Sequence, residues 1–185
     1  MRVIAPVLLC SLNACTNMYP AKTAHRNPDF DNRIKELVSQ GFRGQVLVAH
    51  HGKIVLDAAY GYADAGGSIV VTRATGFGVA SVTKNFTAAA ILKLREAGLL
   101  QMNSKLKTLL SNVPADKASI TIEQLLSHTS GLGTTYAADG ETDRALAETK
   151  LLAQPLNFYP GTDFKYSDDG YVLLAAIIEE TSGRS

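Results

Sequence analysis

The sequence predicts an α+β fold in which a short pair of strands precedes a larger helical region. Two segments rich in β-branched and apolar residues, 45–50 and 53–60, come first, and helical patterns with long loops dominate from Phe77 onward. Strands and helices do not alternate regularly, which argues against a parallel α/β sheet. With 185 residues, 46% of them hydrophobic, the chain is long enough for one domain with a substantial core.

Composition excludes two classes of function. The formal net charge is +1, so the chain lacks the basic surface that nucleic-acid partners require. Its four histidines are scattered and do not combine with cysteines or carboxylates at metal-ligand spacing. We therefore expect no nucleic-acid partner, no metal and no other cofactor.

Residues 1–14 predict an export signal. A single basic residue, Arg2, precedes an apolar stretch at 3–12 that is too short to span a bilayer as a stable helix. The motif LNAC, which ends at Cys15, resembles a bacterial lipobox, in which the cysteine is lipidated after cleavage. A plain signal peptide and a buried apolar N-terminus are the alternatives. We expect an exported protein of the cell envelope, lipid-anchored through Cys15 or periplasmic.

Residues 15–30 are expected to tether the folded part, because they are polar, contain two prolines and show no sustained apolar period. The chain has two cysteines, and processing at Cys15 would remove Cys10 and acylate Cys15, so no disulfide would remain. The folded domain itself is assigned to residues 31–185.

The domain is expected to begin with a helix in DFDNRIKELVSQGF. Three apolar residues share one face of this helix: Ile34, Leu37 and Val38. Asp31 or Asn32 can cap its start and Gly41 can end it. The turn between the following strands is assigned to His51-Gly52. Neither strand alternates cleanly, so we expect both faces of the sheet to be covered.

The motif SVTK, from Ser81 to Lys84, stands where an apolar helix begins. Residues three apart lie on one helical face, so the lysine side chain can reach the serine hydroxyl. A serine needs a base to become a nucleophile, and a buried lysine can serve as one. Apolar residues of this helix occupy almost its whole circumference, which predicts a central, buried position. Alternatively, Ser81 only caps the helix.

The start of this helix favours developing negative charge. Free backbone N–H groups and the helix dipole stabilise an anion near Ser81, and the backbone N–H of Ser81 can form half of an oxyanion hole.

A second motif, YPGTDFKYSDDGYVLLAAIIEETSG, lies far along the chain. A turn at Pro160-Gly161 leads to Tyr166 and Asp168, before an apolar helix from about Gly170 to Glu180 that Gly183 ends. A tyrosine beside a lysine cation has a lowered pKa and can relay a proton. Alternatively, the ring of Tyr166 only packs beneath the loop.

LLSHTSGL contains a histidine near a serine, but we reject a Ser-His pair there. Thr121 and Gln124 form a capping-box pattern, and Ser130-Gly131 is expected to terminate the short helix that follows. His128 is therefore interpreted as a structural residue.

Together these stretches resemble a known family of serine hydrolases, of the class C β-lactamase, D-alanyl-D-alanine carboxypeptidase and esterase type, to which penicillin-binding proteins are similar. The carrying stretches are GYAD, FGVASVTKNFTAAAILKLREAGLL, ITIEQLLSHTSGL and YPGTDFKYSDDGYVLLAAIIEETSG. The resemblance implies that Ser81 is acylated, that Lys84 is its general base and that Tyr166 relays the proton to the leaving group. It also implies an ester, D-peptide or β-lactam-like substrate. HHG at 50–52 precedes the nucleophile and therefore does not match the family's third motif.

The sequence departs from the family at Asp168, where the β-lactamase-like form has Tyr-x-Asn. An ionised carboxylate cannot donate a hydrogen bond to a substrate carbonyl, and it would keep Lys84 charged and shift proton-taking toward Tyr166. We expect poor β-lactam hydrolysis and favour small esters or D-amino-acid peptides. The rival register, which takes Ser167-Asp168-Asp169 as an S-D-N motif, fits the flanking residues less well.

A second departure is that the family's later strands, third motif and second oxyanion-hole N–H cannot be found by Ser185. We therefore expect a truncated member of the fold, inactive or nearly so by itself, with an unpaired edge on its first hairpin. The competing class is a non-catalytic envelope lipoprotein that uses the scaffold for binding or sensing. A pseudogene product or incomplete reading frame is a third possibility.

Overall fold

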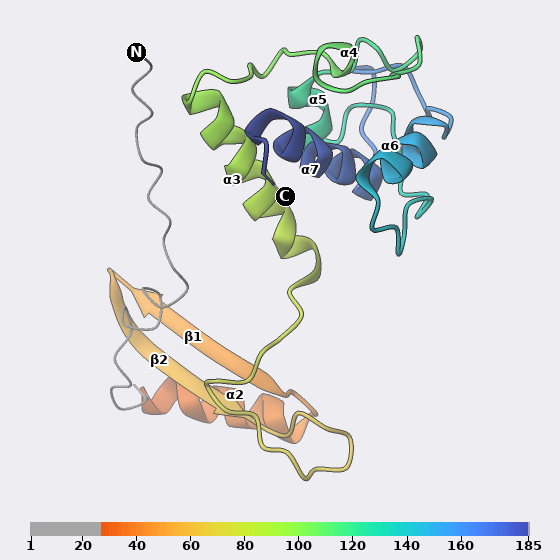
Figure 1. The fold of residues 1–185 in the computed structure, drawn as a ribbon. Helices are drawn as coiled ribbons and strands as arrows, with labels where there is room; N and C mark the ends of the chain where they lie inside the picture. Colours follow the sequence, from red (N-terminus) through yellow and green to blue (C-terminus); the bar gives the residue numbers. More distant parts are fainter. Residues whose placement is uncertain (1–26, 185) are drawn as a thin grey trace. The chain divides into compact units, whose positions relative to one another are not determined.

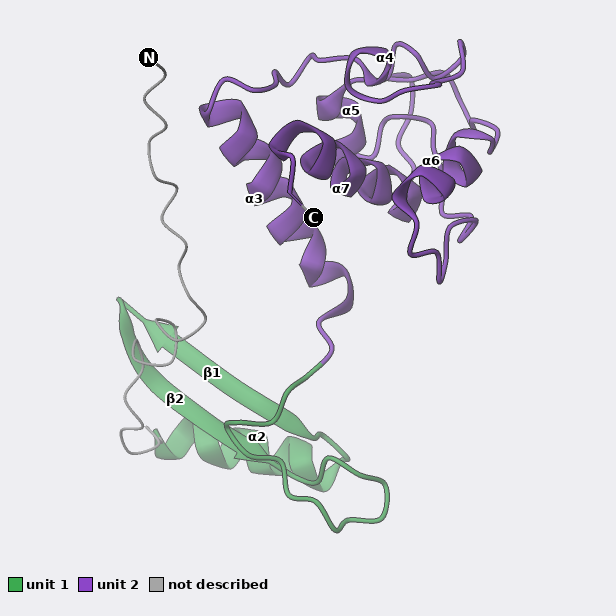
Figure 2. Cartoon of the chain, viewed as in Figure 1, with its two compact units in different colours: residues 1–77 green, residues 78–185 purple. Residues whose placement is uncertain are grey.

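The structure, a computed structural model, describes residues 27–184 (Figure 1). The chain forms two compact units, one ending at Phe77 and the other beginning at Gly78 (Figure 2). The export signal, Cys10 and Cys15 lie outside the described residues, and the assignment of one domain to 31–185 stays a prediction.

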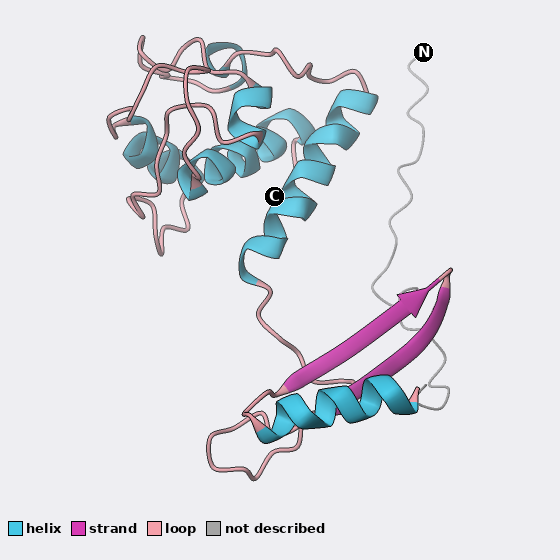
Figure 3. Cartoon of the chain, turned by 180° about the vertical axis from the view of Figure 1, so that it is seen from behind, coloured by secondary structure: helices cyan, strands magenta, loops and turns pink. Residues whose placement is uncertain are grey.

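The first unit consists of one helix and a two-stranded antiparallel hairpin: α2 (Pro28–Ser39), β1 (Gly44–His50) and β2 (Lys53–Tyr60). The helix lies along one face of the hairpin (Figure 3). His51 and Gly52 form the turn with φ of 48° and 72°, so the turn predicted from the sequence is confirmed. The register shifts between Val48 and Ala49, as expected for a bulge.

The predicted cap of the first helix is wrong. Asn27 caps α2 by accepting hydrogen bonds from the backbone N–H groups of Asp29 and Phe30 at 3.0 and 3.3 Å, and Pro28 starts the helix. Residues 28–30, assigned to the tether, are therefore helical. Asp31 instead lies buried inside the unit and accepts a 2.7 Å hydrogen bond from the Tyr60 hydroxyl, which ties the helix to the hairpin.

The hairpin buries mainly one face, contrary to our expectation. Leu56, Ala58 and Tyr60 form the small core of this unit with partly buried residues of α2, whereas Leu47 is 62% exposed. The alternation is visible in the burial pattern once it is read across both strands. Within this unit a single helix has room to cover only one side of two strands.

The second unit is helical: a 3₁₀ turn (Ala80–Val82), α3 (Thr83–Glu96), α4 (Leu106–Leu109), α5 (Ile122–Leu126), α6 (Arg144–Leu152) and α7 (Asp168–Ser182). α7 contacts the other four α-helices and forms the centre of the unit (Figure 1). Leu173, Leu174 and Ile177 on α7 are completely buried. The predicted end of this helix is confirmed, because Gly183 adopts φ 66° at its C-terminus.

α3 is less buried than its composition predicts. Ile91 and Leu94 are buried in the core shared with α7, but Phe86 is 70% exposed and Leu92 is 43% exposed. In this unit, α3 has a helical partner only along the face that contacts α7, so apolar residues elsewhere on its circumference remain accessible.

The short helix α5 opens as expected but ends early. Thr121 and Gln124 form both hydrogen bonds of a capping box, at 3.2 and 3.0 Å. The helix stops at Leu126, before the predicted Ser130-Gly131, because His128 already turns the backbone with φ 60°. Across the described residues, no helix combines the length and apolar character that a membrane crossing requires.

Candidate active site

Ser81 lies in a 3₁₀ turn that leads directly into α3. Ala80, immediately before it, has φ 43°, a conformation that residues other than glycine rarely adopt. Such backbone strain often occurs at functional sites. Lys84 follows one turn later on the same face, and its Nζ donates to the Ser81 hydroxyl at 3.3 Å. The predicted pairing of the two side chains is confirmed.

The start of α7 brings the other two predicted residues to the same place. Tyr166 precedes the helix, Ser167 caps it and Asp168 occupies its first turn. Ser167 is completely buried, accepts from the backbone N–H of Gly170 at 2.8 Å and donates to the carbonyl of Gly133 at 2.6 Å. These two hydrogen bonds of the Ser167 hydroxyl fix the backbone on either side of it, and with it Tyr166 and Asp168.

Four side chains that are far apart in sequence therefore form one hydrogen-bonded cluster. The Tyr166 hydroxyl donates to Ser81 Oγ at 2.7 Å, and Lys84 Nζ forms a short ion pair with the Asp168 carboxylate. Lys84 Nζ also lies 4.9 Å from the centre of the Tyr166 ring. The Lys84 side chain is 18% exposed, so solvent only partly screens these contacts.

The charges in this cluster oppose a neutral lysine. Burial lowers the pKa of Lys84, but hydrogen bonding to Asp168 and the neighbouring Tyr166, together with their charges, outweighs it and raises the pKa above 10.5. The pKa of Tyr166 is lowered from 10.0, first by the contact with Lys84 and then by the hydrogen bond to Ser81. The deprotonated form, which is the form that can accept a proton, thus becomes more populated at Tyr166 and less populated at Lys84.

A loop after α5 supports the start of α7. Thr134 Oγ1 accepts from the backbone N–H of Asp168 at 2.9 Å. The buried Asp169 carboxylate accepts from the backbone N–H and the hydroxyl of Thr135, at 3.1 and 2.7 Å. Asp169 therefore has a structural task, which weighs against the rival S-D-N register.

His128 contacts this cluster more closely than the sequence indicated. Its Nδ1 accepts from the backbone N–H of Ser167 at 3.1 Å, and its ring centre lies 4.6 Å from that of Tyr166. We interpreted it as structural, and it does hold the chain together. Its contact with Tyr166 was missed, because no sequence pattern shows which ring lies under a tyrosine 38 residues later.

A hollow beside Ser81 gives a substrate access to the cluster. Its volume is about 410 Å³, and it lies between α3 and the start of α7. Lys84 and Asp168 line it together with apolar or small side chains, among them Thr87, Val172 and Ala175. Apolar walls with a few convergent polar groups are typical of small-molecule sites.

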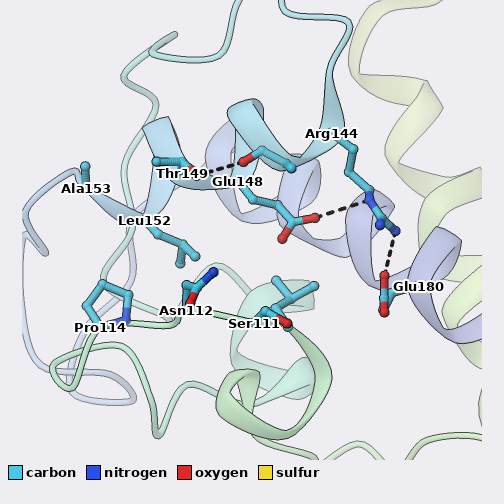
Figure 4. Close-up of a pocket in the computed structure, with 11 residues that line it drawn as sticks. Ser111, Asn112, Pro114, Arg144, Glu148, Thr149, Leu152, Ala153 and Glu180 are labelled. Carbon is cyan, nitrogen blue, oxygen red and sulfur yellow. Dashed lines mark hydrogen bonds and ion pairs between the residues drawn. The ribbon is translucent and has the colours of Figure 1, made fainter.

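A second hollow of this unit, about 470 Å³, lies away from these residues (Figure 4). Arg144 extends from α6 and pairs with Glu148 at 3.5 Å and with Glu180 at 2.9 Å. Burial raises the pKa of Glu148, and the Arg144 charge partly offsets this. None of the predicted site residues lines this hollow, and its cation, Arg144, is already paired with two carboxylates. The cluster at Ser81 therefore remains the candidate active site.

The structure places the remaining histidine motif elsewhere. His50 and His51 lie at the tip of the hairpin in the first unit, with ring centres 4.0 Å apart. Within residues 27–184, no group of three or more histidine, cysteine or acidic side chains is arranged to hold a metal ion.

Comparisons with known proteins identify the family of the chain. A family model described as Beta-lactamase matches residues 30–185. The chain is 36% identical over 164 residues to PbpX of Bacillus subtilis (strain 168), which carries a penicillin-binding-protein name, covering 88% of this chain. FmtA from Staphylococcus aureus superimposes with a TM-score of 0.79 and 25% identity over 90% of this chain. EstCE1, described as a hydrolase with promiscuous acyltransferase activity, gives 0.71 and 25% over 83%.

The chain spans 40% of the length of PbpX, 47% of the FmtA chain and 46% of the EstCE1 chain. The family match nevertheless includes both motifs of the cluster and most of the sequence. The chain has the α+β fold of these solved structures, its relatives carry penicillin-binding-protein names, and it belongs to the Beta-lactamase family.

Proposed function

We propose that the protein is a serine hydrolase that acts through an acyl-enzyme on small esters or D-amino-acid peptides. Ser81 Oγ forms a bond to the substrate carbonyl carbon, and the bond from that carbon to the leaving group breaks. Water then attacks the ester on Ser81, which releases the acid and restores the hydroxyl. The observation that carries the proposal is the contact of Ser81 with both Tyr166 and Lys84.

The proton from Ser81 passes to Tyr166 in this proposal. Tyr166 acts as the tyrosinate, which its lowered pKa makes more available; its oxygen, 2.7 Å from Ser81 Oγ, accepts the Ser81 proton during attack and delivers it to the leaving group. Lys84 remains a cation because of Asp168 and stabilises the tyrosinate electrostatically. The general base implied by resemblance, Lys84, thus becomes the electrostatic partner of Tyr166.

The negative charge on the substrate oxygen is stabilised by the start of α3. The backbone N–H of Ser81 is one donor, and the helix dipole favours an anion beside it. The strained backbone at Ala80 orients this segment. We assign the oxyanion-hole role to Ser81 for these reasons.

Of the two proposed substrate classes, Asp168 favours the esters over the peptides. Amide and β-lactam carbonyls benefit from a donor at this position, which a carboxylate is unable to provide. Esters have a better leaving group and need less such assistance. The description of EstCE1, a structural neighbour, as a hydrolase with acyltransferase activity is in keeping with an acyl-enzyme route.

The test measures the intact mass of the chain after exposure to a fluorophosphonate. We expect a single slow adduct with the wild type and none with Ser81→Ala, because only Ser81 has neighbours that activate it. Exposure to nitrocefin in parallel is expected to leave the mass unchanged. Sustained turnover is not expected from the 185-residue chain.

Two outcomes would contradict this proposal. An adduct retained in Ser81→Ala would place the reactive nucleophile elsewhere, and a rapid nitrocefin adduct would reverse the substrate preference. A folded wild type with no adduct would favour the alternative function, a binding or sensing module of the cell envelope. The Lys84–Asp168 ion pair is the observation in favour of that alternative, since it keeps the lysine protonated and so unable to accept a proton from Ser81.

A further inference from the structure

His128 makes three contacts with the short segment that contains Tyr166. Its carbonyl accepts from the backbone N–H of Lys165 at 3.0 Å, and its Nδ1 accepts from the backbone N–H of Ser167 at 3.1 Å. Its ring lies against the Tyr166 ring, 4.6 Å between centres with an angle of 34°. One residue thus binds the chain immediately before and after Tyr166 and supports its side chain.

We propose that His128 is a positioning residue for the proton relay: as a neutral imidazole that accepts at Nδ1, it holds the Tyr166 hydroxyl against Ser81. This role deepens the proposed function and rests on it, because it concerns the efficiency of proton transfer at Ser81. His128 does not contact Ser81 or the substrate hollow and therefore acts only through Tyr166.

The required form of the imidazole follows from the backbone. The N–H of Ser167 can only donate, so Nδ1 must offer a lone pair and the proton of the neutral ring must reside on Nε2. Protonation of Nδ1 would direct two N–H groups at each other. The contact that fixes Ser167, and with it Tyr166, is then lost.

The surroundings of the ring favour this neutral form. The ring centres of Tyr166 and Tyr171 lie 4.6 and 5.2 Å from that of His128, and the Phe164 ring approaches His128 edge-on at 6.0 Å. Burial lowers the pKa of His128 first, the Lys84 cation lowers it further, and the Asp168 carboxylate opposes them. With a pKa below 6.5, His128 is neutral above that pH, and the positioning contact is lost as the pH falls through the pKa.

The backbone conformation suggests an informative pair of variants. His128 has φ 60°, in the left-handed region that asparagine tolerates better than most residues. In His128→Asn, the side-chain oxygen occupies nearly the place of Nδ1 and can accept the same hydrogen bond. In His128→Phe, the ring is retained but the acceptor is removed. His51→Phe is the matched control, because His51 has φ 48° at the tip of the hairpin.

The experiment measures the rate of fluorophosphonate labelling against pH, together with the imidazole ¹⁵N signals of the full chain. We expect His128→Phe to label about 10²-fold more slowly, as for a misplaced catalytic group. His128→Asn should retain most of the labelling rate. Its rate should fall less at low pH than that of the wild type, because asparagine has no proton to gain there. His51→Phe should label like the wild type.

The ¹⁵N spectrum tests the positioning role separately from the proposed chemistry, because it is also recorded in Ser81→Ala. We expect an Nε2–H tautomer with unprotonated Nδ1, and a change of the Tyr166 ring signals when His128 titrates below pH 6.5. An Nδ1–H tautomer, or Tyr166 signals indifferent to that titration, would overturn the proposal. So would equal labelling rates for His128→Phe and the wild type. If the wild type is not labelled but its His128 shows the expected Nε2–H tautomer, the result would count against the hydrolase proposal and leave the positioning contact standing.

Discussion

At the scale of single residues, Asp168 determines the charge of the cluster. Its carboxylate forms the ion pair with Lys84 and occupies the first turn of α7, where the helix dipole stabilises an anion. It thereby raises the pKa of Lys84 and, through its own negative charge, opposes the lowering of the Tyr166 pKa that Lys84 and Ser81 produce. One carboxylate therefore makes both proton carriers hold their protons more tightly.

Replacement of this residue tests the electrostatics directly. In Asp168→Asn the negative charge disappears, so the pKa values of both Lys84 and Tyr166 fall. Whichever of the two accepts the proton from Ser81, its basic form becomes available at lower pH. We expect the profile of fluorophosphonate labelling against pH to move to lower pH.

The matched control is Asp163→Asn. Asp163 is an exposed residue of the loop before Tyr166, and its carboxylate accepts a hydrogen bond from the backbone N–H of Phe164 rather than from the cluster. Its profile should coincide with that of the wild type. A profile for Asp168→Asn that stays in place or moves to higher pH would show that the carboxylate does not control the proton acceptor.

At the scale of elements, the connection between α5 and α7 positions the cluster. Gly131 lies within it at φ 82°, and its carbonyl accepts from the backbone N–H of Asn157 at 2.8 Å. A Cβ atom added at Gly131 would lie 2.2 Å from the carbonyl oxygen of Phe158. Only glycine allows these two chain segments to approach so closely.

Gly131→Ala should therefore be strongly destabilising. We expect a loss of roughly 3 kcal/mol or more in the free energy of unfolding, from the left-handed backbone and the clash together. Gly140→Ala provides the control, because Gly140 has φ 72° but open space around its Cβ position. There the loss should be about 1–2 kcal/mol, from the backbone alone. Urea unfolding of both variants measures the difference, and equal losses would contradict the clash.

At the scale of the whole molecule, the N-terminal segment predicts where the protein resides. We propose that export is followed by lipidation of Cys15, which would attach the chain to the cell envelope. Expression in a bacterium with labelled palmitate should give a labelled protein in the membrane fraction. Cys15→Ala should remove the label, whereas Cys10→Ala, within the segment that cleavage removes, should keep it. Label retained by Cys15→Ala would exclude the lipobox.

Local chemistry made several elements predictable from the sequence. The His51-Gly52 turn, the capping box at Thr121 and Gln124, and the stop at Gly183 depend on neighbours within a few residues, and all three occur as expected. The pairing of Ser81 with Lys84 also follows from helical spacing. Such features are fixed by backbone geometry and short-range hydrogen bonds, which a sequence contains explicitly.

Features that depend on distant partners were predicted less well. Asp31 or Asn32 was expected to cap the first helix, but Asp31 instead accepts a hydrogen bond from the hydroxyl of Tyr60, 29 residues later. The apolar circumference of α3 suggested a buried helix, yet only the face that contacts α7 is covered within its unit. Neither partner can be identified from the local pattern, because burial depends on which elements the chain brings together.

The sequence by itself determined the family and the α+β class and singled out Ser81, Lys84, Tyr166 and Asp168 as candidate site residues, because motif spacing and helical periodicity are local properties. Only the tertiary structure decided how these side chains meet. In the folded chain the Asp168 carboxylate pairs with Lys84, the Tyr166 hydroxyl donates to Ser81 and the His128 ring packs against the Tyr166 ring. These contacts join residues 38 to 85 positions apart, and their electrostatic coupling exists only once folding has brought the charges together.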